Sequence, residues 1–210
     1  GGMPIETDRW GIDIVTAGLQ KCLGGPSGSA PITISDRAAE HIFTRRHVEK
    51  GIRRDDIADG SGPRIASNYF DLAMIMDYWS EKRLNHHTEA TTMLYGAREC
   101  ARVALGEGLE ARFARHASAG AAMEAGLAAL GLAIFGGTEN RMTNVTGAWI
   151  PEGVDGEQVR AAMRDHFEIE IGTAFGPLAG RIWRFGAMGY NARKDTILTT
   201  LAALEACLAI

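Results

Sequence analysis

The sequence has few of the residues that mark extracellular, membrane or metal-binding proteins. Its three cysteines are an odd number without CxxC spacing, which predicts neither a disulfide framework nor a zinc site. No stretch approaches the roughly 18 uninterrupted apolar residues of a membrane span, and the first residues lack the basic start and apolar run of a signal peptide. The net charge of −4 gives no reason to expect nucleic acid or an anionic membrane as a partner. These absences favour a cytoplasmic globular protein.

Lysine is also scarce, because the chain has four lysines against 18 arginines. Lys50 and Lys82 lie in charged runs and Lys194 begins a predicted helix, whereas Lys21 has small and apolar neighbours. A lysine becomes a nucleophile toward carbonyl groups when desolvation or nearby cations lower its pKa. Lys21 is therefore the candidate nucleophile, although a surface lysine in a hairpin turn explains the same residues.

The hydrophobic pattern predicts a mixed α/β chain. Residues 44–66 are polar and predict a surface excursion, and the order of elements from about residue 109 onward predicts a compact α+β unit. Two strands joined by a Gly/Pro turn do not form a stable sheet alone, so further strands must complete it. The expected strands are 10–19, 31–35, 132–135, 143–150, 167–171 and 181–185, and the expected helices are 69–79, about 89–105, 109–130, 155–165 and 191–208.

Three further features are candidates for a site. The adjacent His86 and His87 lack the i, i+4 spacing of a helical zinc pair, so no metal is predicted. Thr88 precedes a predicted helix, where it serves as an N-cap or, with the free amides of the first turn, as a phosphate site. Arg184 has apolar neighbours in a predicted strand and therefore needs an anion, which is either an internal carboxylate or a substrate.

Taken together and in order, five sequence blocks resemble a known enzyme family. The chain is similar over essentially all of its length to the class V aminotransferases of the alanine–glyoxylate and serine–glyoxylate group. The resemblance is strongest to the (S)-ureidoglycine–glyoxylate branch, which acts in purine catabolism. The blocks are Gly-Leu-Gln-Lys-Cys-Leu-Gly-Gly-Pro-Ser-Gly at 18–28, Asn-His-His-Thr-Glu-Ala-Thr at 85–91, Phe-Gly-Pro-Leu-Ala-Gly at 175–180, Ile-Trp-Arg-Phe-Gly at 182–186 and Gly-Tyr-Asn-Ala at 189–192.

The resemblance implies pyridoxal 5'-phosphate as cofactor and assigns residues to it. Lys21 would form the Schiff base with the cofactor and later move the proton at the substrate carbon. Gln20 would contact the cofactor phosphate, and His87 would also lie at the cofactor. Thr88 would reach the phosphate in the neighbouring subunit, which implies a homodimer with a shared active site.

The resemblance also assigns the substrate contacts. Arg184 would bind the substrate carboxylate with two parallel hydrogen bonds, which lysine does less well. Asn85 stands where the alanine–glyoxylate relatives carry a tyrosine, and an amide suits a ureido group, so Asn85 is the candidate for specificity. The implied reaction is transfer of an amino group to glyoxylate from ureidoglycine or a small amino acid such as alanine or serine.

The implied fold is the carboxyl-terminal part of a fold-type I pyridoxal-phosphate-dependent transferase. Residues 1–108 would be the end of the large cofactor-binding domain, and residues 109–210 a small α+β domain. The other half of such an enzyme supplies a phosphate-binding helix terminus, a ring stacked on the cofactor and an aspartate at its pyridine nitrogen. Two alternatives stay open, namely a class V lyase or cysteine desulfurase, and a half-chain without catalysis of its own.

Overall fold

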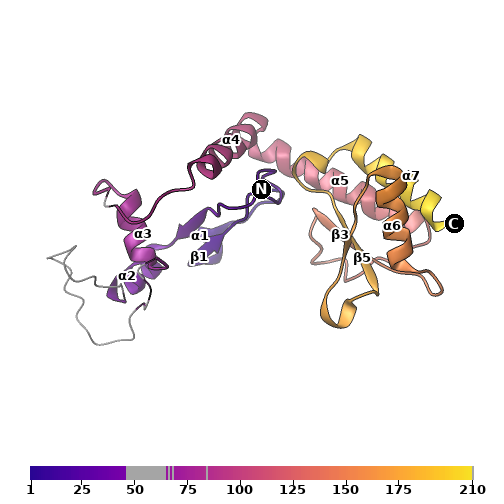
Figure 1. Cartoon of the computed structure of the whole chain (residues 1–210), viewed down its shortest axis with the longest axis horizontal. Helices are drawn as coiled ribbons and strands as arrows, with labels where there is room; N and C mark the ends of the chain where they lie inside the picture. The colour runs from indigo at the N-terminus through magenta and orange to yellow at the C-terminus, as the bar shows by residue number, and fades with distance from the viewer. Residues whose placement is uncertain (46–64, 66, 68, 84, 210) are drawn as a thin grey trace. The chain divides into compact units, whose positions relative to one another are not determined.

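The computed structural model describes residues 1–45, 65, 67, 69–83 and 85–209 (Figure 1). The surface excursion predicted over 44–66 therefore lies almost wholly outside the described residues. The contacts divide the chain into two compact units. The first unit comprises Gly1–Ile5, Leu19–Ser27 and Tyr95–Ile210, and the second comprises Glu6–Gly18 and Gly28–Leu94. The domain division predicted at 108/109 refers to a complete enzyme and stays a prediction.

The second unit contains a short antiparallel hairpin. Its two strands pair as predicted, with Val15 opposite Thr33. The first strand is shorter than the predicted 10–19, because the chain forms a helical turn that ends at Gly11 in the left-handed conformation, at φ 64°. The elements are α1 (Thr7–Trp10), β1 (Ile14–Thr16), β2 (Ile32–Ile34), α2 (Asp36–Thr44) and α3 (Leu72–Trp79).

Helix α3 begins later than the sequence pattern indicates. The predicted helix started at Tyr69, whereas the observed N-cap is Asp71, whose Oδ1 accepts a hydrogen bond from the Ala73 amide at 2.8 Å. A carboxylate at this position satisfies an amide that has no partner within the helix. The Asp71 side chain is itself buried.

The first unit combines a three-stranded antiparallel sheet with long helices. The strand order is β3-β5-β4, and helices α5, α6 and α7 pack together beside the sheet (Figure 1). Its elements are α4 (Thr91–Glu107, shared with the second unit), α5 (Leu109–Ala129), β3 (Val145–Trp149), α6 (Gly156–Phe167), β4 (Gly172–Thr173), the 3-10 turn η1 (Gly176–Leu178), β5 (Ile182–Gly186), the 3-10 turn η2 (Gly189–Asn191) and α7 (Lys194–Leu208).

Two of the short strands predicted in this unit were wrong. Of the segment 132–135, only Ile134 forms an isolated bridge, to Ala148 of β3. The segment 167–171 precedes the observed strand β4 and is not part of it. Its start belongs to α6, which ends where Glu168 takes the left-handed conformation at φ 57° and turns the chain.

One face of the sheet forms the core of the first unit. Along β5, Trp183 and Phe185 are buried and alternate with the exposed Arg184, so the arginine lies on the opposite face. The Trp183 indole donates to the Gly156 carbonyl oxygen at 3.1 Å, which satisfies its buried N–H. Other large side chains that are fully buried with them include Leu127, Met163 and Leu204.

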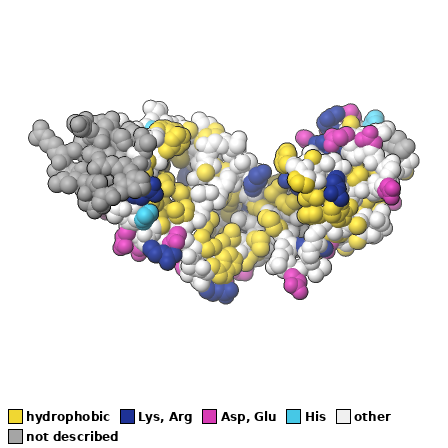
Figure 2. Space-filling view, turned by 90° about the horizontal axis from the view of Figure 1, so that it is seen from below, with side chains coloured by type: hydrophobic (Ala, Val, Ile, Leu, Met, Phe, Trp, Pro, Cys, Tyr) yellow, Lys and Arg dark blue, Asp and Glu magenta, His cyan; other side chains and the backbone are white. Residues whose placement is uncertain are grey.

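Several large apolar side chains of the second unit are exposed instead of buried. They include Trp10, Tyr69, Phe70 and Trp79. Figure 2 shows groups of hydrophobic side chains at the surface on the face drawn there. Apolar groups of this kind mark contact surfaces for other polypeptides. No helix in the described part of the chain is long and apolar enough to cross a membrane.

Gly120 provides a test of the packing of α5. A Cβ at this buried position would overlap the carbonyl group of Thr143 and would lie only 2.9 Å from the carbonyl carbon. We expect Gly120→Ala to destabilise the chain by about 1–3 kcal/mol, because backbone cannot move aside cheaply. Gly106→Ala on α4 is the matched control, because a Cβ there meets nothing within 4 Å and should stabilise the helix by up to about 1 kcal/mol. Urea unfolding of both variants measures the difference, and equal effects would show that Gly120 is not close-packed.

Candidate functional site

Lys21 lies in a turn that is anchored on both sides. We call residues 19–25 the lysine turn. Leu19 and Cys22 are buried, with 1% and 6% of their surface exposed, whereas Gln20 and Lys21 between them are exposed. The Gly25 amide closes the turn by donating to the Leu19 carbonyl oxygen at 2.9 Å. The fold therefore fixes the backbone of Lys21 while leaving its amine accessible, and no ion pair holds that amine among the described residues.

A buried arginine holds the lysine turn from the side of α5. Arg112, only 3% exposed, donates from Nη2 to the Cys22 carbonyl oxygen and from Nε to that of Gly1 at 3.1 Å. Its Nη1 pairs with Glu107 Oε2 at 2.7 Å. A guanidinium with several donors in a fixed plane can satisfy these acceptors together. Arg112 thus ties the residue after Lys21 to the long helix.

Glu107 joins this arginine to a second one. Arg115 donates to Glu107 at 2.5 Å and also to the carbonyl oxygens of Gly189 at 2.8 Å and Ala192 at 2.9 Å. Hydrogen bonds from Arg115 and then from Arg112 lower the pKa of the Glu107 carboxyl to about 2. Because this pKa is depressed, the contacts of Glu107 with Arg115 and Arg112 contribute their full stability to the fold above the ordinary pKa of 4.5. This stability is lost as the pH falls toward 2. The carboxylate is therefore charged at neutral pH.

Arg184 lies in the middle of the exposed sheet face. Its neighbours across both flanking strands are glycines, Gly147 on β3 and Gly172 on β4. Its Nε donates to the Thr173 carbonyl oxygen at 2.6 Å, and its guanidinium carbon lies 5.5 Å from the centre of the Phe175 ring. These contacts orient the arginine and leave its two Nη groups for another acceptor.

An internal carboxylate does not neutralise Arg184 in the part of the chain that the structure describes. The arginine lines a pocket of about 610 Å³ together with two acidic residues, Glu124 and Glu139. Glu124 pairs with Arg141, and neither acid forms an ion pair with Arg184. Of the two partners that the sequence left open for this arginine, a carboxylate from outside the described residues is favoured.

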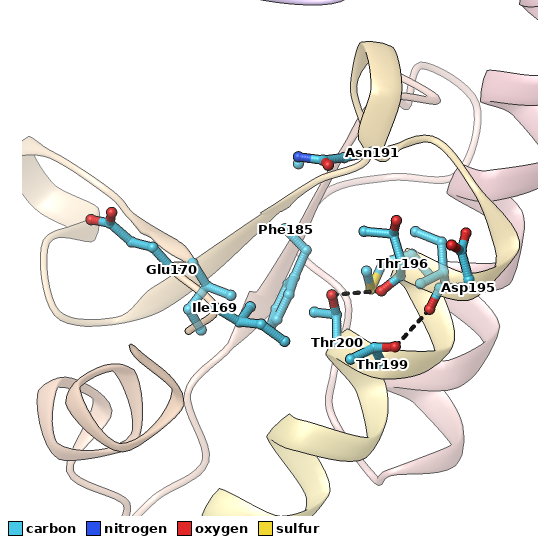
Figure 3. Close-up of a pocket in the computed structure, with 12 residues that line it drawn as sticks. Ile169, Glu170, Phe185, Asn191, Asp195, Thr196, Thr199 and Thr200 are labelled. Atoms are coloured by element: carbon cyan, nitrogen blue, oxygen red, sulfur yellow. Dashed lines mark hydrogen bonds between the residues drawn. The ribbon is translucent and has the colours of Figure 1, made fainter. Parts of the chain in front are cut away.

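A second pocket in the first unit is a weaker candidate. It has a volume of about 380 Å³, lies beside α7 and includes Glu170 and Asp195 (Figure 3). The hydroxyl groups of Thr199 and Thr200 donate to the carbonyl oxygens of Asp195 and Thr196 at 2.9 and 2.8 Å, so those donors are used within the helix. None of the residues predicted from the sequence lines this pocket, and we do not assign a substrate to it.

The remaining predicted site residues belong to the second unit. Asn85 and Thr88 are exposed. His87 is half-buried between His86, with 2.8 Å between their Nδ1 atoms, and Glu89, whose Oε1 lies 3.3 Å from Nε2 of His87. The predicted N-cap at Thr88 is wrong, because α4 begins only at Thr91. The cofactor and substrate roles of these residues stay predictions.

Part of the predicted site belongs to one compact unit. Gly189, which follows β5 and its Arg184, packs directly on the lysine turn, and a Cβ on it would lie 3.2 Å from the Cys22 carbonyl oxygen and 3.4 Å from that of Lys21. The first unit therefore holds Gln20, Lys21 and Arg184. Sequence reasoning missed the buried arginine Arg112 and its partners, although arginines beside the apolar stripe of 109–130 were a signal.

Comparison with known proteins identifies relatives of the whole chain. No family model matches the sequence. The chain is 54% identical over 210 residues to the (S)-ureidoglycine–glyoxylate transaminase of Bacillus subtilis, a match that covers 99% of this chain and 50% of that protein. It is 33% identical over 208 residues to the alanine–glyoxylate aminotransferase of Drosophila melanogaster, covering 96% of this chain and 49% of the relative.

A solved structure agrees with these sequences. The crystal structure of the ureidoglycine–glyoxylate aminotransferase from Bacillus subtilis superposes with a TM-score of 0.87 at 50% identity, over 99% of this chain and 50% of that one. The chain thus spans about half the length of the relatives it matches, which fits the predicted carboxyl-terminal half. The predicted resemblance and fold class are confirmed, and the chain is homologous to one half of the ureidoglycine–glyoxylate and alanine–glyoxylate aminotransferases and has the mixed α/β fold of that half.

Proposed function

We propose that this chain is the carboxyl-terminal half of a pyridoxal-phosphate-dependent aminotransferase that uses glyoxylate as amino acceptor. The observation that carries the proposal is an exposed lysine on an anchored turn, within a chain that is 54% identical to a transaminase named for this acceptor. We assign ureidoglycine, or a small amino acid such as alanine or serine, as the amino donor.

The residues present fit the cofactor. A cofactor aldehyde needs a primary amine that is accessible and not locked in an ion pair, and Lys21 meets both conditions within the described residues. Buried neighbours hold the backbone of its turn while the lysine itself stays exposed. Lys21 would hold the cofactor covalently, Gln20 would contact its phosphate and His87 would lie at the cofactor, while Thr88 would contact the phosphate of the cofactor in a neighbouring subunit. When bound, pyridoxal phosphate supplies an electron sink for the substrate carbon.

Two side chains of the first unit would act directly on the substrate. Nζ of Lys21 moves the proton at the substrate carbon, a step for which an amine on a fixed backbone is well suited. The two Nη groups of Arg184 bind the substrate carboxylate, and the Phe175 ring beside the guanidinium keeps its plane oriented. Charge neutralisation and orientation thus come from one arginine.

Specificity and assembly are assigned to the second unit. The exposed amide of Asn85 would recognise the ureido group of the donor, and we propose a role in purine catabolism on the basis of this donor. Thr88 would reach the cofactor of a second subunit, so we propose a homodimer with shared active sites. The three cysteines are free and buried, which agrees with a reducing compartment and with our proposal of a cytoplasmic enzyme.

The alternative of a cysteine desulfurase is less well supported. Such an enzyme requires a reactive thiol, whereas Cys22, Cys100 and Cys207 are all buried. Burial also raises the pKa of the Cys207 thiol, which lowers its reactivity. The alternative of a half-chain without catalysis differs from our proposal only in whether another half completes the site.

Borohydride labelling tests the proposal. Because the chain matches half of its relatives, it should be joined behind the amino-terminal half of the Bacillus subtilis transaminase; we call this protein the completed enzyme. With pyridoxal phosphate, the completed enzyme should absorb visible light, and reduction should fix the label on Lys21. Label on Lys50, Lys82 or Lys194 would reject the assignment. The 210-residue chain alone should bind the cofactor poorly and be inactive, and full activity would reject the half-chain proposal.

A further inference from the structure

His116 is a buried titratable group that the proposed chemistry does not use. It lies on α5, is fully buried, and packs one turn after Arg112. Its Nδ1 lies 2.8 Å from the Arg112 carbonyl oxygen, and its Nε2 lies 3.0 Å from the Gly189 amide nitrogen. Because a carbonyl oxygen only accepts and an amide N–H only donates, Nδ1 must carry the proton and Nε2 must be the acceptor.

This arrangement requires a neutral imidazole. A protonated ring would direct an N–H group from Nε2 at the N–H group of Gly189, so one buried donor would face another. Burial lowers the pKa of His116, and the positive charges of Arg115 and Arg112 act in the same direction, whereas the hydrogen bond to the Arg112 carbonyl oxygen and the charge of Glu107 oppose the shift. The histidine is therefore held as a hydrogen-bond acceptor at neutral pH.

Nε2 of His116 accepts its hydrogen bond from Gly189, and this glycine packs on the lysine turn. Gly189 has φ 59°, in the left-handed region that side chains rarely adopt, and its α-carbon faces the backbone of Lys21, Cys22 and Gly24. Its carbonyl oxygen is fixed separately by Arg115. Side chains of α5 thus bind both the amide N–H and the carbonyl oxygen of Gly189. The α-carbon of the same glycine packs on the turn that carries Lys21.

We propose that His116 is a positioning residue for Lys21, because its neutral imidazole fixes Gly189 and thereby the backbone on which the lysine turn rests. The inference rests on the proposed role of Lys21 for its functional meaning. It assigns to the histidine no contact with substrate or cofactor. The lysine turn itself offers a direct probe of this support, because the Cys22 thiol beside Lys21 is buried and accepts a hydrogen bond from Asn144 at 3.0 Å.

The experiment measures native-state alkylation of each cysteine in the 210-residue chain by iodoacetamide and peptide mass spectrometry. His116→Leu removes the acceptor and leaves the Gly189 amide unpaired. We expect the alkylation rate of Cys22 to rise at least about tenfold, which corresponds to 1.4 kcal/mol of lost protection. Cys207 on α7 lies in the core of the first unit and should keep its rate.

Two further variants separate positioning from general loss of stability. His116→Gln keeps an acceptor oxygen for the Gly189 amide and should restore most of the protection of Cys22. Met123→Ala is the matched control, because Met123 is also buried on α5 but packs in the core beside the sheet. It should expose Cys207 at least as much as Cys22. Equal increases at Cys22 and Cys207 in His116→Leu, or no rescue by glutamine, would overturn the proposal.

The second readout is kinetic and uses the completed enzyme. His116→Leu should lower kcat about tenfold while the KM for glyoxylate stays unchanged, because the substrate-binding arginine is not disturbed. A rise in KM alone would contradict a role in positioning the lysine. The alkylation assay needs no cofactor, so its result is independent of the borohydride labelling. Absence of a label on Lys21 would reject the proposed function. A selective rise in the alkylation rate of Cys22 would still show that His116 fixes the lysine turn.

Discussion

Lys21→Ala is expected to abolish transamination by the completed enzyme while leaving the fold intact. The side chain is exposed and makes no ion pair among the described residues, so its removal should change the free energy of unfolding by less than about 0.5 kcal/mol. If Lys21 transfers the proton as proposed, loss of its amine should lower kcat by at least roughly 10²–10⁴-fold. Steady-state kinetics with glyoxylate and urea unfolding measure the two effects.

Lys194→Ala is the matched control for this change. Lys194 is also exposed and also belongs to the first unit, at the start of α7. Its replacement should leave kcat and stability nearly unchanged. Comparable kinetic losses in both variants would point to a general effect of lysine removal and would contradict a special role of Lys21.

Arg184→Lys is expected to impair substrate binding and not folding. Lysine keeps the charge but loses the planar pair of donors, so kcat/KM should fall by one to two decades, as expected for a charge-assisted hydrogen bond of about 1.5–3 kcal/mol. The KM for glyoxylate and for the donor should rise, and cofactor absorbance and Tm should stay nearly constant. Kinetics over a range of both substrates provide the measurement.

The neighbouring Arg181 provides the control. It is exposed just before β5, and its guanidinium lies 5.2 Å from the centre of the Trp149 ring instead of facing the pocket of Arg184. Arg181→Lys should leave both KM values unchanged. A loss of stability without a kinetic effect in Arg184→Lys would show that an internal acid, and not the substrate, is its partner.

The fold was predictable where periodicity extends over many residues. The helix predicted over 109–130 is observed as α5, and four residues spaced three or four apart on one stripe of it, His116, Gly120, Met123 and Leu127, are buried. Leu109 in the same stripe is exposed, because it lies in the first turn, where the helix has less to pack against. Short strands were less predictable, since three or four residues carry too little pattern to separate a strand from extended coil.

The candidate site was also predictable only in part from the sequence. The sequence singles out Lys21 through the scarcity of lysine and through resemblance, and it points to Arg184 through its apolar neighbours. The supporting contacts of Arg112 and His116 go mainly to backbone carbonyl and amide groups. Every residue carries such groups, so a sequence gives no signal for which of them a side chain will bind. Only the structure, in which α5 packs against the lysine turn and the turn at Gly189, reveals these hydrogen bonds.

The two glycines beside Arg184 have a consequence for substrate choice. Across β3, β5 and β4, the row Gly147, Arg184 and Gly172 presents a single side chain on the exposed face of the sheet. Arg184 is therefore the only side chain of this row, while much of the wall of its pocket comes from outside the three strands, from residues 135–142. If Arg184 binds the substrate carboxylate as proposed, we expect a change of amino donor to require changes in residues 135–142 and not in the strand residues beside the arginine.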